Sequence, residues 1–185
     1  MKINDMTRIS IFTVLTIVGT RIMIPVPLVP FTLQTLVCMT AGIVLGAKHG
    51  AASQALYMLL GLAGLPVFTS GGGIGAIFTP SFGYIIGFIA CAWVSGTISS
   101  WLKKARGRLT LPGCFAAAFA GVVTAYAFGL IHLYIILNFY MENSSASLFK
   151  VLSIGFLSTI GGDIIKAALC AVISVKLEKT GIIKG

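Results

Sequence analysis

The sequence predicts an all-α integral membrane protein, a bundle of six transmembrane helices with both the N- and C-termini in the cytoplasm. Three observations predict it: the composition, a series of apolar segments and the placement of the basic residues. Of the 185 residues, 57% are hydrophobic and only 9% are charged, and the mean hydropathy is +1.03. Soluble domains carry about 25% charged residues. So few charges could not cover a water-soluble surface, which excludes a soluble enzyme and a disordered chain.

Six apolar segments follow one another, at residues 9–24, 32–46, 50–63, 82–102, 111–137 and 151–177. A helix needs roughly 20 apolar residues to cross a bilayer, so the last three are long enough. The second and third are short, and we expect them to form a helical hairpin around Lys48 and His49. A barrel would need a period-two alternation that is missing. The first segment has no signal-peptide cleavage site and is expected to be retained, so residues 1–185 form one transmembrane substrate-binding domain.

The basic residues lie between the apolar segments rather than on one face of a fold. With the N-terminus placed in the cytoplasm, all of the 13 Lys and Arg residues except Arg21, Lys150 and Lys166 fall on the cytoplasmic side. This bias fits the rule that cytoplasmic loops of membrane proteins are positively charged. A nucleic-acid partner is not expected, because such proteins gather Lys and Arg on one surface.

Three connections then face outside, at residues 25–30, 64–81 and 138–147. The first contains Pro25, Pro27 and Pro30, which favour an extended path. The second is rich in glycine but also carries large apolar side chains such as Phe68 and Ile74. A flexible connector has no need of such side chains. We therefore favour a lid that packs on the outer mouth of the bundle, with a plain surface connector as the alternative.

The main candidate site is Asp163 with Lys166, well inside the sixth segment. Residues three apart share a helix face, and a bare charge at mid-membrane costs roughly 2.5–3.5 kcal/mol on insertion scales. The two side chains are therefore expected to face each other. One interpretation is a structural ion pair, and the other is a polar ligand site in the bundle interior, which is the usual role of intramembrane charges.

Two other side chains are candidates with alternatives. Gln34 could bind a ligand through its amide or serve as an interhelical hydrogen bond. Tyr84 could stack on a ligand or belong to the interfacial aromatic belt. The sequence has no Walker A motif, no His-Glu-x-x-His and no Gly-x-Ser-x-Gly, so neither ATP hydrolysis nor an enzyme activity is expected. No metal site or cofactor is expected either. The chain should bind a small molecule from outside and depend on a partner for energy.

An ordered set of motifs runs through most of the chain. It comprises Pro27-Leu28-Val29-Pro30-Phe31-Thr32-Leu33-Gln34, then Tyr57-x-x-x-Gly61-x-x-Gly64-Leu65-Pro66, Gly71-Gly72-Gly73, Pro80-x-x-Gly83-Tyr84 and Gly162-Asp163-x-x-Lys166. This set resembles the BioY family, the biotin-specific S components of energy-coupling factor (ECF) transporters. The resemblance implies a six-helix fold in the prokaryotic cell membrane that captures biotin from the outer side. It also implies a partner assembly of one ECF transmembrane coupling protein and two ATPase subunits.

The resemblance also suggests roles for the site residues. Asp163 would accept from the two N–H groups of the biotin ureido ring, and Lys166 or Gln34 would donate to a ligand oxygen or hold Asp163 in place. Phe31 and Tyr84 would form the wall around the apolar body. The biotin carboxylate would lie near the mouth, with the candidates Thr32, Ser70 and Gly73.

The family's coupling contact is a pair of small residues on the first helix, often alanines four apart. That pattern is absent here, and the candidates are Ser10, Thr13 and Thr16. The alternative function is a standalone facilitator or secondary carrier for biotin or a related vitamin.

Overall fold

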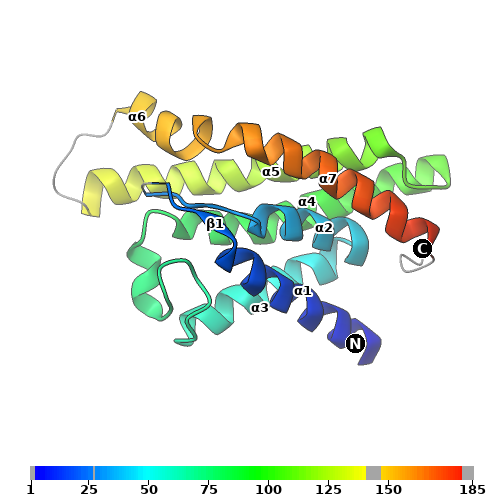
Figure 1. Ribbon diagram of the computed structural model, residues 1–185, viewed down its shortest axis with the longest axis horizontal. Helices are drawn as coiled ribbons and strands as arrows, with labels where there is room; N and C mark the ends of the chain where they lie inside the picture. The colour runs from blue at the N-terminus through cyan, green and yellow to red at the C-terminus, as the bar shows by residue number, and fades with distance from the viewer. Residues whose placement is uncertain (1–2, 27, 141–146, 181–185) are drawn as a thin grey trace.

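A computed structural model describes residues 3–26, 28–140 and 147–180 as a bundle of helices that run along its longest axis (Figure 1). Pro27, Lys2, Lys184 and most of the predicted connection 138–147 lie outside the described residues. Helix α4 (Phe82–Arg106) packs against α2 (Gln34–Leu45), α3 (Ala47–Leu62) and α5 (Leu111–Ile135). The core of the bundle therefore lies around α4.

Helix α1 (Ile3–Arg21) begins and ends earlier than the predicted segment 9–24. Asp5 in its first turn and Arg21 in its last turn have the charges that a helix dipole favours at these ends. The chain then forms the short strand β1 (Met23–Ile24), which pairs antiparallel with β2 (Phe31–Thr32). These two strands are the exception to the all-α prediction, and the proline-rich connection joins them.

The hairpin of α2 and α3 turns at Gly46, not around Lys48 and His49 as the sequence suggested. Gly46 has φ +81°, a conformation that glycine adopts without steric cost, so one residue suffices for the turn. The two helices then pack with their backbones close together. A Cβ atom at Gly50 would lie 2.7 Å from the Cα atom of Gly42.

The sixth apolar segment is not the continuous helix that the sequence predicted over residues 151–177. It consists of α6 (Leu148–Leu152), a π-helical turn η3 (Ser153–Leu157) and α7 (Ile160–Lys179). The N–H group of Ser158 bonds to the carbonyl of Ser153, five residues earlier, at 3.3 Å. The fifth segment likewise ends in a π-helical turn, η2 (Ile136–Tyr140).

The glycine-rich connection 64–81 packs against the bundle and contains a short 3-10 helix, η1 (Ile74–Phe78). Phe68 is fully buried, with its ring 5.4 Å from that of Tyr57 and 6.2 Å from that of Phe82, both in edge-on contacts. The Arg21 side chain donates to the carbonyl of Pro66. The connection therefore contacts the helices α1, α3 and α4, as expected of a lid that packs on the bundle.

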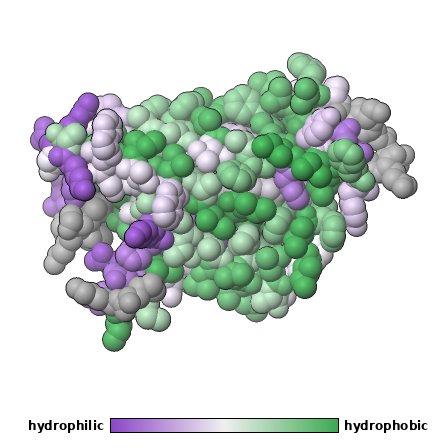
Figure 2. Space-filling model, turned by 180° about the vertical axis from the view of Figure 1, so that it is seen from behind, coloured by the Kyte–Doolittle hydropathy of each residue, from purple (hydrophilic) through white to green (hydrophobic). Residues whose placement is uncertain are grey.

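Within the part of the chain that the structure describes, three helical stretches are long and apolar enough to cross a membrane: Phe82–Arg106, Leu111–Tyr140 and Leu148–Lys179. They correspond to the three segments that the sequence marked as long enough. Large apolar side chains on the outside include Ile131, 63% exposed, and Ile165, 64% exposed. Figure 2 shows a mostly hydrophobic middle, with hydrophilic residues gathered at one end. The fold is that of a helical membrane protein.

The hydrophilic end of the molecule is the end where α1 begins and α7 ends (Figures 1 and 2). There Glu178 of α7 forms a 3.2 Å ion pair with Lys103 of α4. Its other carboxylate oxygen accepts from the backbone N–H of Leu109 at 2.7 Å. The last turn of α7 is therefore tied to the α4–α5 connection.

Candidate ligand-binding site

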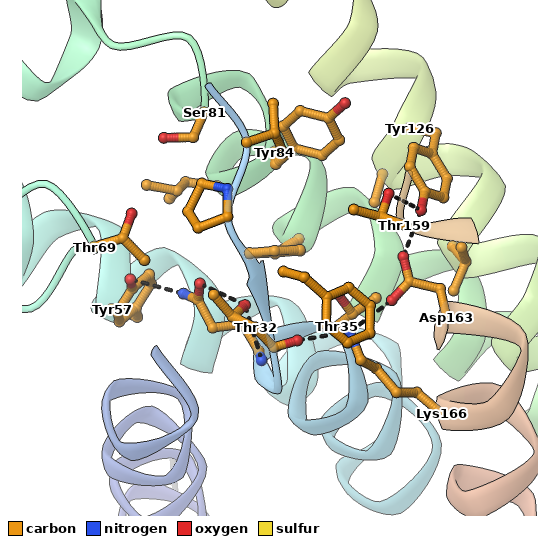
Figure 3. A pocket seen from close by; sticks show the side chains of 18 residues that line it. Thr32, Thr35, Tyr57, Thr69, Ser81, Tyr84, Tyr126, Thr159, Asp163 and Lys166 are labelled. Atoms are coloured by element: carbon orange, nitrogen blue, oxygen red, sulfur yellow. Dashed lines mark hydrogen bonds and ion pairs between the residues drawn. The ribbon is translucent and has the colours of Figure 1, made fainter. Parts of the chain in front are cut away.

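A cavity lies inside the bundle, between the β2–α2 segment on one side and α4, α5 and α7 on the others (Figure 3). Its empty space, with the open mouth and the solvent there included, is about 610 Å³. The lining residues are Val29, Pro30, Phe31, Thr32, Gln34, Thr35, Tyr57, Thr69, Ser81, Tyr84, Ile85, Phe88, Val122, Ala125, Tyr126, Thr159, Asp163 and Lys166.

Asp163 and Lys166 form a buried ion pair at the wall of this cavity. Lys166 Nζ lies 2.7 Å from Asp163 Oδ1, and the two residues are only 4–5% exposed. The ammonium also donates to the carbonyl of Thr32 at 2.6 Å and lies 3.5 Å above the centre of the Phe31 ring. A carboxylate, a carbonyl and an aromatic face thus surround the positive charge, which reduces the cost of burying it.

The interruption of the sixth segment places Asp163 in the first turn of α7. The dipole of a helix favours a negative charge there, and the Asp163 N–H bonds to the carbonyl of Thr159 at 3.1 Å. Next to it, Gly162 lets the Phe31 ring approach the helix, since a Cβ atom at Gly162 would overlap that ring. Gly161 faces open space.

Tyr126 and Thr159 complete the cluster, and the sequence analysis did not identify either. The Tyr126 hydroxyl donates to Asp163 Oδ2 at 2.5 Å and lies 2.7 Å from the hydroxyl of Thr159. One signal was present: a tyrosine inside an apolar membrane segment needs a partner for its hydroxyl. The sequence could not show that this partner is Asp163.

Gln34 holds the opposite side of the cavity, in the first turn of α2. Its Nε2 donates to the Tyr57 hydroxyl at 2.8 Å, and its Oε1 accepts from the Thr32 hydroxyl at 3.1 Å. Tyr57 in turn donates to the Val67 carbonyl at 3.2 Å. The interhelical hydrogen bond expected as one role of Gln34 is therefore present, and Tyr57 connects it to the glycine-rich connection.

The cavity offers a distinct combination of chemical groups. One wall carries an acceptor, Asp163, whose two oxygens each already accept one hydrogen bond. A carboxylate accepts about four, so it can still accept from a ligand. The remaining wall is largely apolar, with Ile85, Phe88 and Val122. The arrangement suits a small molecule with polar N–H groups at one end and an apolar body. Among the described residues, no group of three or more His, Cys, Asp and Glu side chains could hold a metal ion.

Six of the residues predicted for substrate binding meet at this cavity, namely Phe31, Thr32, Gln34, Tyr84, Asp163 and Lys166. Ser70 and Gly73 do not line it; Ser70 is exposed, and the Gly73 N–H bonds to the Gly61 carbonyl at 2.7 Å. Thr69 and Ser81 line the cavity instead. The binding roles of all these residues stay predictions.

The three predicted docking residues on α1 do not share one exposed surface. Thr13 is 2% exposed and Thr16 is fully buried, because both face α3. The Thr13 hydroxyl donates to the Ser53 carbonyl at 3.0 Å, and Thr16 accepts from the Gln54 amide at 3.1 Å. Only Ser10 is exposed. Threonine at these positions serves the α1–α3 contact, which the spacing of small residues alone could not distinguish from a docking face.

The fold and the cavity define a class of protein: a helical membrane protein with a site for a small molecule inside the bundle. The comparison with known families then gives the particular family. The BioY family model matches residues 1–181, and the chain belongs to this family.

Relatives and a solved structure agree with this assignment. A protein named "Probable biotin transporter BioY" from Lysinibacillus sphaericus is 38% identical over 95% of this chain and 87% of its own length. "Biotin transporter BioY" from Thermotoga maritima is 36% identical over 95% of this chain and 96% of its own. A crystal structure of the S-component for biotin from an ECF-type ABC transporter is 32% identical, with a TM-score of 0.80, and covers 97% of this chain and 95% of that one. These relatives are named as transporters and not as enzymes.

Proposed function

We propose that this chain is the biotin-binding S component of an ECF-type importer. The buried Asp163–Lys166 pair at the wall of a largely apolar cavity is the observation that carries the proposal. The bundle does not need this ion pair for its stability, because apolar side chains of the same volume can replace a buried ion pair without loss. The position of the pair at a cavity suits a polar ligand. The names of the relatives supply the identity of that ligand.

The chemistry of biotin suits the groups that line the cavity. The ureido ring has two N–H donors and one carbonyl, and Asp163 can accept from the donors while Lys166 or Gln34 donates to the carbonyl. The apolar thioether ring and chain lie against Phe31 and Tyr84. The ligand carboxylate points to the end of the cavity lined by Thr69 and Ser81, whose hydroxyls can donate to it. Ser70 and Gly73, on the adjacent connection, remain candidates for that end, as does Thr32.

The membrane orientation follows from the charges. Six helices cross the cell membrane, and both termini lie in the cytoplasm, at the hydrophilic end where α1 begins and α7 ends. The connection 64–81 then faces outside, beside the cavity, and biotin enters from that side. This orientation is supported by the basic residues at the ends of α4 and α7, such as Lys104, Arg106 and Lys179.

Energy for import comes from partner subunits, an ECF transmembrane coupling protein and two ATPases. The chain has no Walker A motif of its own. The proposal predicts that proteoliposomes with this chain alone bind biotin but do not accumulate it, and that adding the partner subunits and ATP restores uphill uptake. Uptake of labelled biotin is the measurement. Accumulation by the lone chain, dependent on a proton gradient, would favour the alternative of a standalone carrier.

Replacement of Gly162 by alanine tests the contact between Phe31 and Lys166. The new methyl group has to displace the Phe31 ring, so the ammonium loses its aromatic face. We expect biotin to bind roughly three- to tenfold more weakly. Gly161→Ala is the matched control, because a Cβ atom there meets open space. Equal affinities of the two variants, measured by calorimetry, would show that the position of the ring does not matter for binding.

A further inference from the structure

The π-helical turn η3 changes the hydrogen bonds of the backbone just before Asp163. In a continuous α-helix the Thr159 N–H would bond to the carbonyl of Gly155, four residues earlier. Here it bonds to the carbonyl of Phe156 at 3.1 Å instead. The Gly155 carbonyl is thereby removed from its helical pairing, and a buried carbonyl needs another donor.

Tyr84 of α4 supplies the closer of two donors. Its hydroxyl donates to the Gly155 carbonyl at 2.8 Å, while the Thr159 hydroxyl donates to the same carbonyl at 3.4 Å. Two glycines make room for the side chain: a Cβ atom at Gly155 would lie 2.6 Å from the Tyr84 hydroxyl, and one at Gly129 would overlap the Tyr84 ring. The side chain thus fits between α5 and the interrupted turn. Figure 3 shows its hydroxyl pointing away from the side of the cavity where Thr32 and Tyr57 lie.

The same turn packs on the residue that orients Asp163. The Tyr126 ring lies between Phe156, at 5.0 Å, and Tyr84, at 6.0 Å, with an edge-on contact to each. The Tyr126 hydroxyl donates to Asp163 Oδ2 at 2.5 Å. Any shift of the turn would therefore move Tyr126 and the first turn of α7 together.

We infer that Tyr84 is a positioning residue for the ligand site. Its hydroxyl holds the interrupted turn at Gly155, so that α7 begins where Asp163 meets Tyr126 and Lys166 at the cavity. This role rests on the proposed function and deepens it. It adds to the expected stacking of the Tyr84 ring on the ligand a second task for the hydroxyl, which acts through Asp163.

The test is Tyr84→Phe, which removes the hydroxyl and keeps the ring. We expect biotin affinity to fall roughly three- to tenfold, the effect of one net hydrogen bond. In the absence of biotin, amide hydrogen exchange over residues 153–165 should be faster in Tyr84→Phe than in the parent protein. Tyr134→Phe, on α5 and away from the cavity, is the matched control and should change neither quantity. A Tyr84→Phe protein with parental affinity and parental exchange would overturn the inference.

A double-mutant comparison separates this role from general support of the fold. In an Asp163→Asn background, the Tyr84→Phe change should weaken biotin binding by less than about twofold, since its effect passes through the carboxylate. The same loss in both backgrounds would mean that the hydroxyl acts independently of Asp163, against the inference. A parent chain that binds no biotin would instead defeat the proposed function. The exchange measurement would then still decide whether Tyr84 holds the turn.

Discussion

Replacing Lys166 by methionine is expected to lower the free energy of unfolding by about 3–5 kcal/mol, the usual cost of leaving one charge of a buried pair without its partner. Asp163 would keep only the hydrogen bond from Tyr126, and the Thr32 carbonyl would lose its donor. Denaturant titration in detergent, followed by the fluorescence of Trp93 and Trp101, measures the change.

Two further variants give this experiment its controls. Lys104→Met removes an exposed lysine from α4 and should change stability by less than about 1 kcal/mol. The double variant Asp163→Leu with Lys166→Met should regain most of the lost stability, because apolar side chains can replace a buried ion pair, but it should not bind biotin. Parental stability of Lys166→Met alone would show that the buried Asp163 carboxylate does not depend on Lys166 as its countercharge.

Replacing Asp163 by asparagine is expected to weaken biotin binding roughly ten- to hundredfold. The amide keeps the size of the side chain and an oxygen for Lys166, but it removes the negative charge that strengthens hydrogen bonds from the ureido N–H groups. The fold should also lose stability, because the buried Lys166 ammonium keeps no full countercharge, so affinity is compared at a temperature where both proteins are folded. Competition against labelled biotin, on samples whose melting curves show them folded at the assay temperature, measures the effect.

The control for this variant is Asp5→Asn, which removes a carboxylate from the first turn of α1, outside the cavity. Its biotin affinity should equal that of the parent. If Asp163→Asn bound biotin as tightly as Asp5→Asn, the assignment of the ureido ring to Asp163 would be wrong, and the search for the ureido partner would move to Gln34.

The main features of the site could be predicted from the sequence, because they depend on the spacing of neighbouring residues. Asp163 and Lys166 are three residues apart in an apolar segment, and a helix brings such residues to one face. The structure shows them in contact. The long apolar segments were equally clear, since length and composition alone determine whether a helix can span a bilayer.

The remaining features depend on contacts between distant segments. Tyr126 is one hydroxyl in an apolar helix, and only the packing of α5 on α7 gives it Asp163 as a partner. The interruption before Asp163 has no proline to mark it. Thr13 and Thr16 looked like a surface of small residues, but the packing of α1 on α3 buries them. Local patterns therefore predicted the helices and the charged pair. The contact of Tyr126 with Asp163 and the interruption before α7 could be seen only in the folded structure.

The most direct test of the proposed function is a calorimetric titration of the purified, biotin-free chain with biotin, after native mass spectrometry has shown that no ligand is retained. We expect tight binding of one biotin per chain, without ATP and without partner subunits. A folded sample that gives no binding signal would contradict the central claim, and the chain would then need another ligand for the cavity around Asp163 and Lys166.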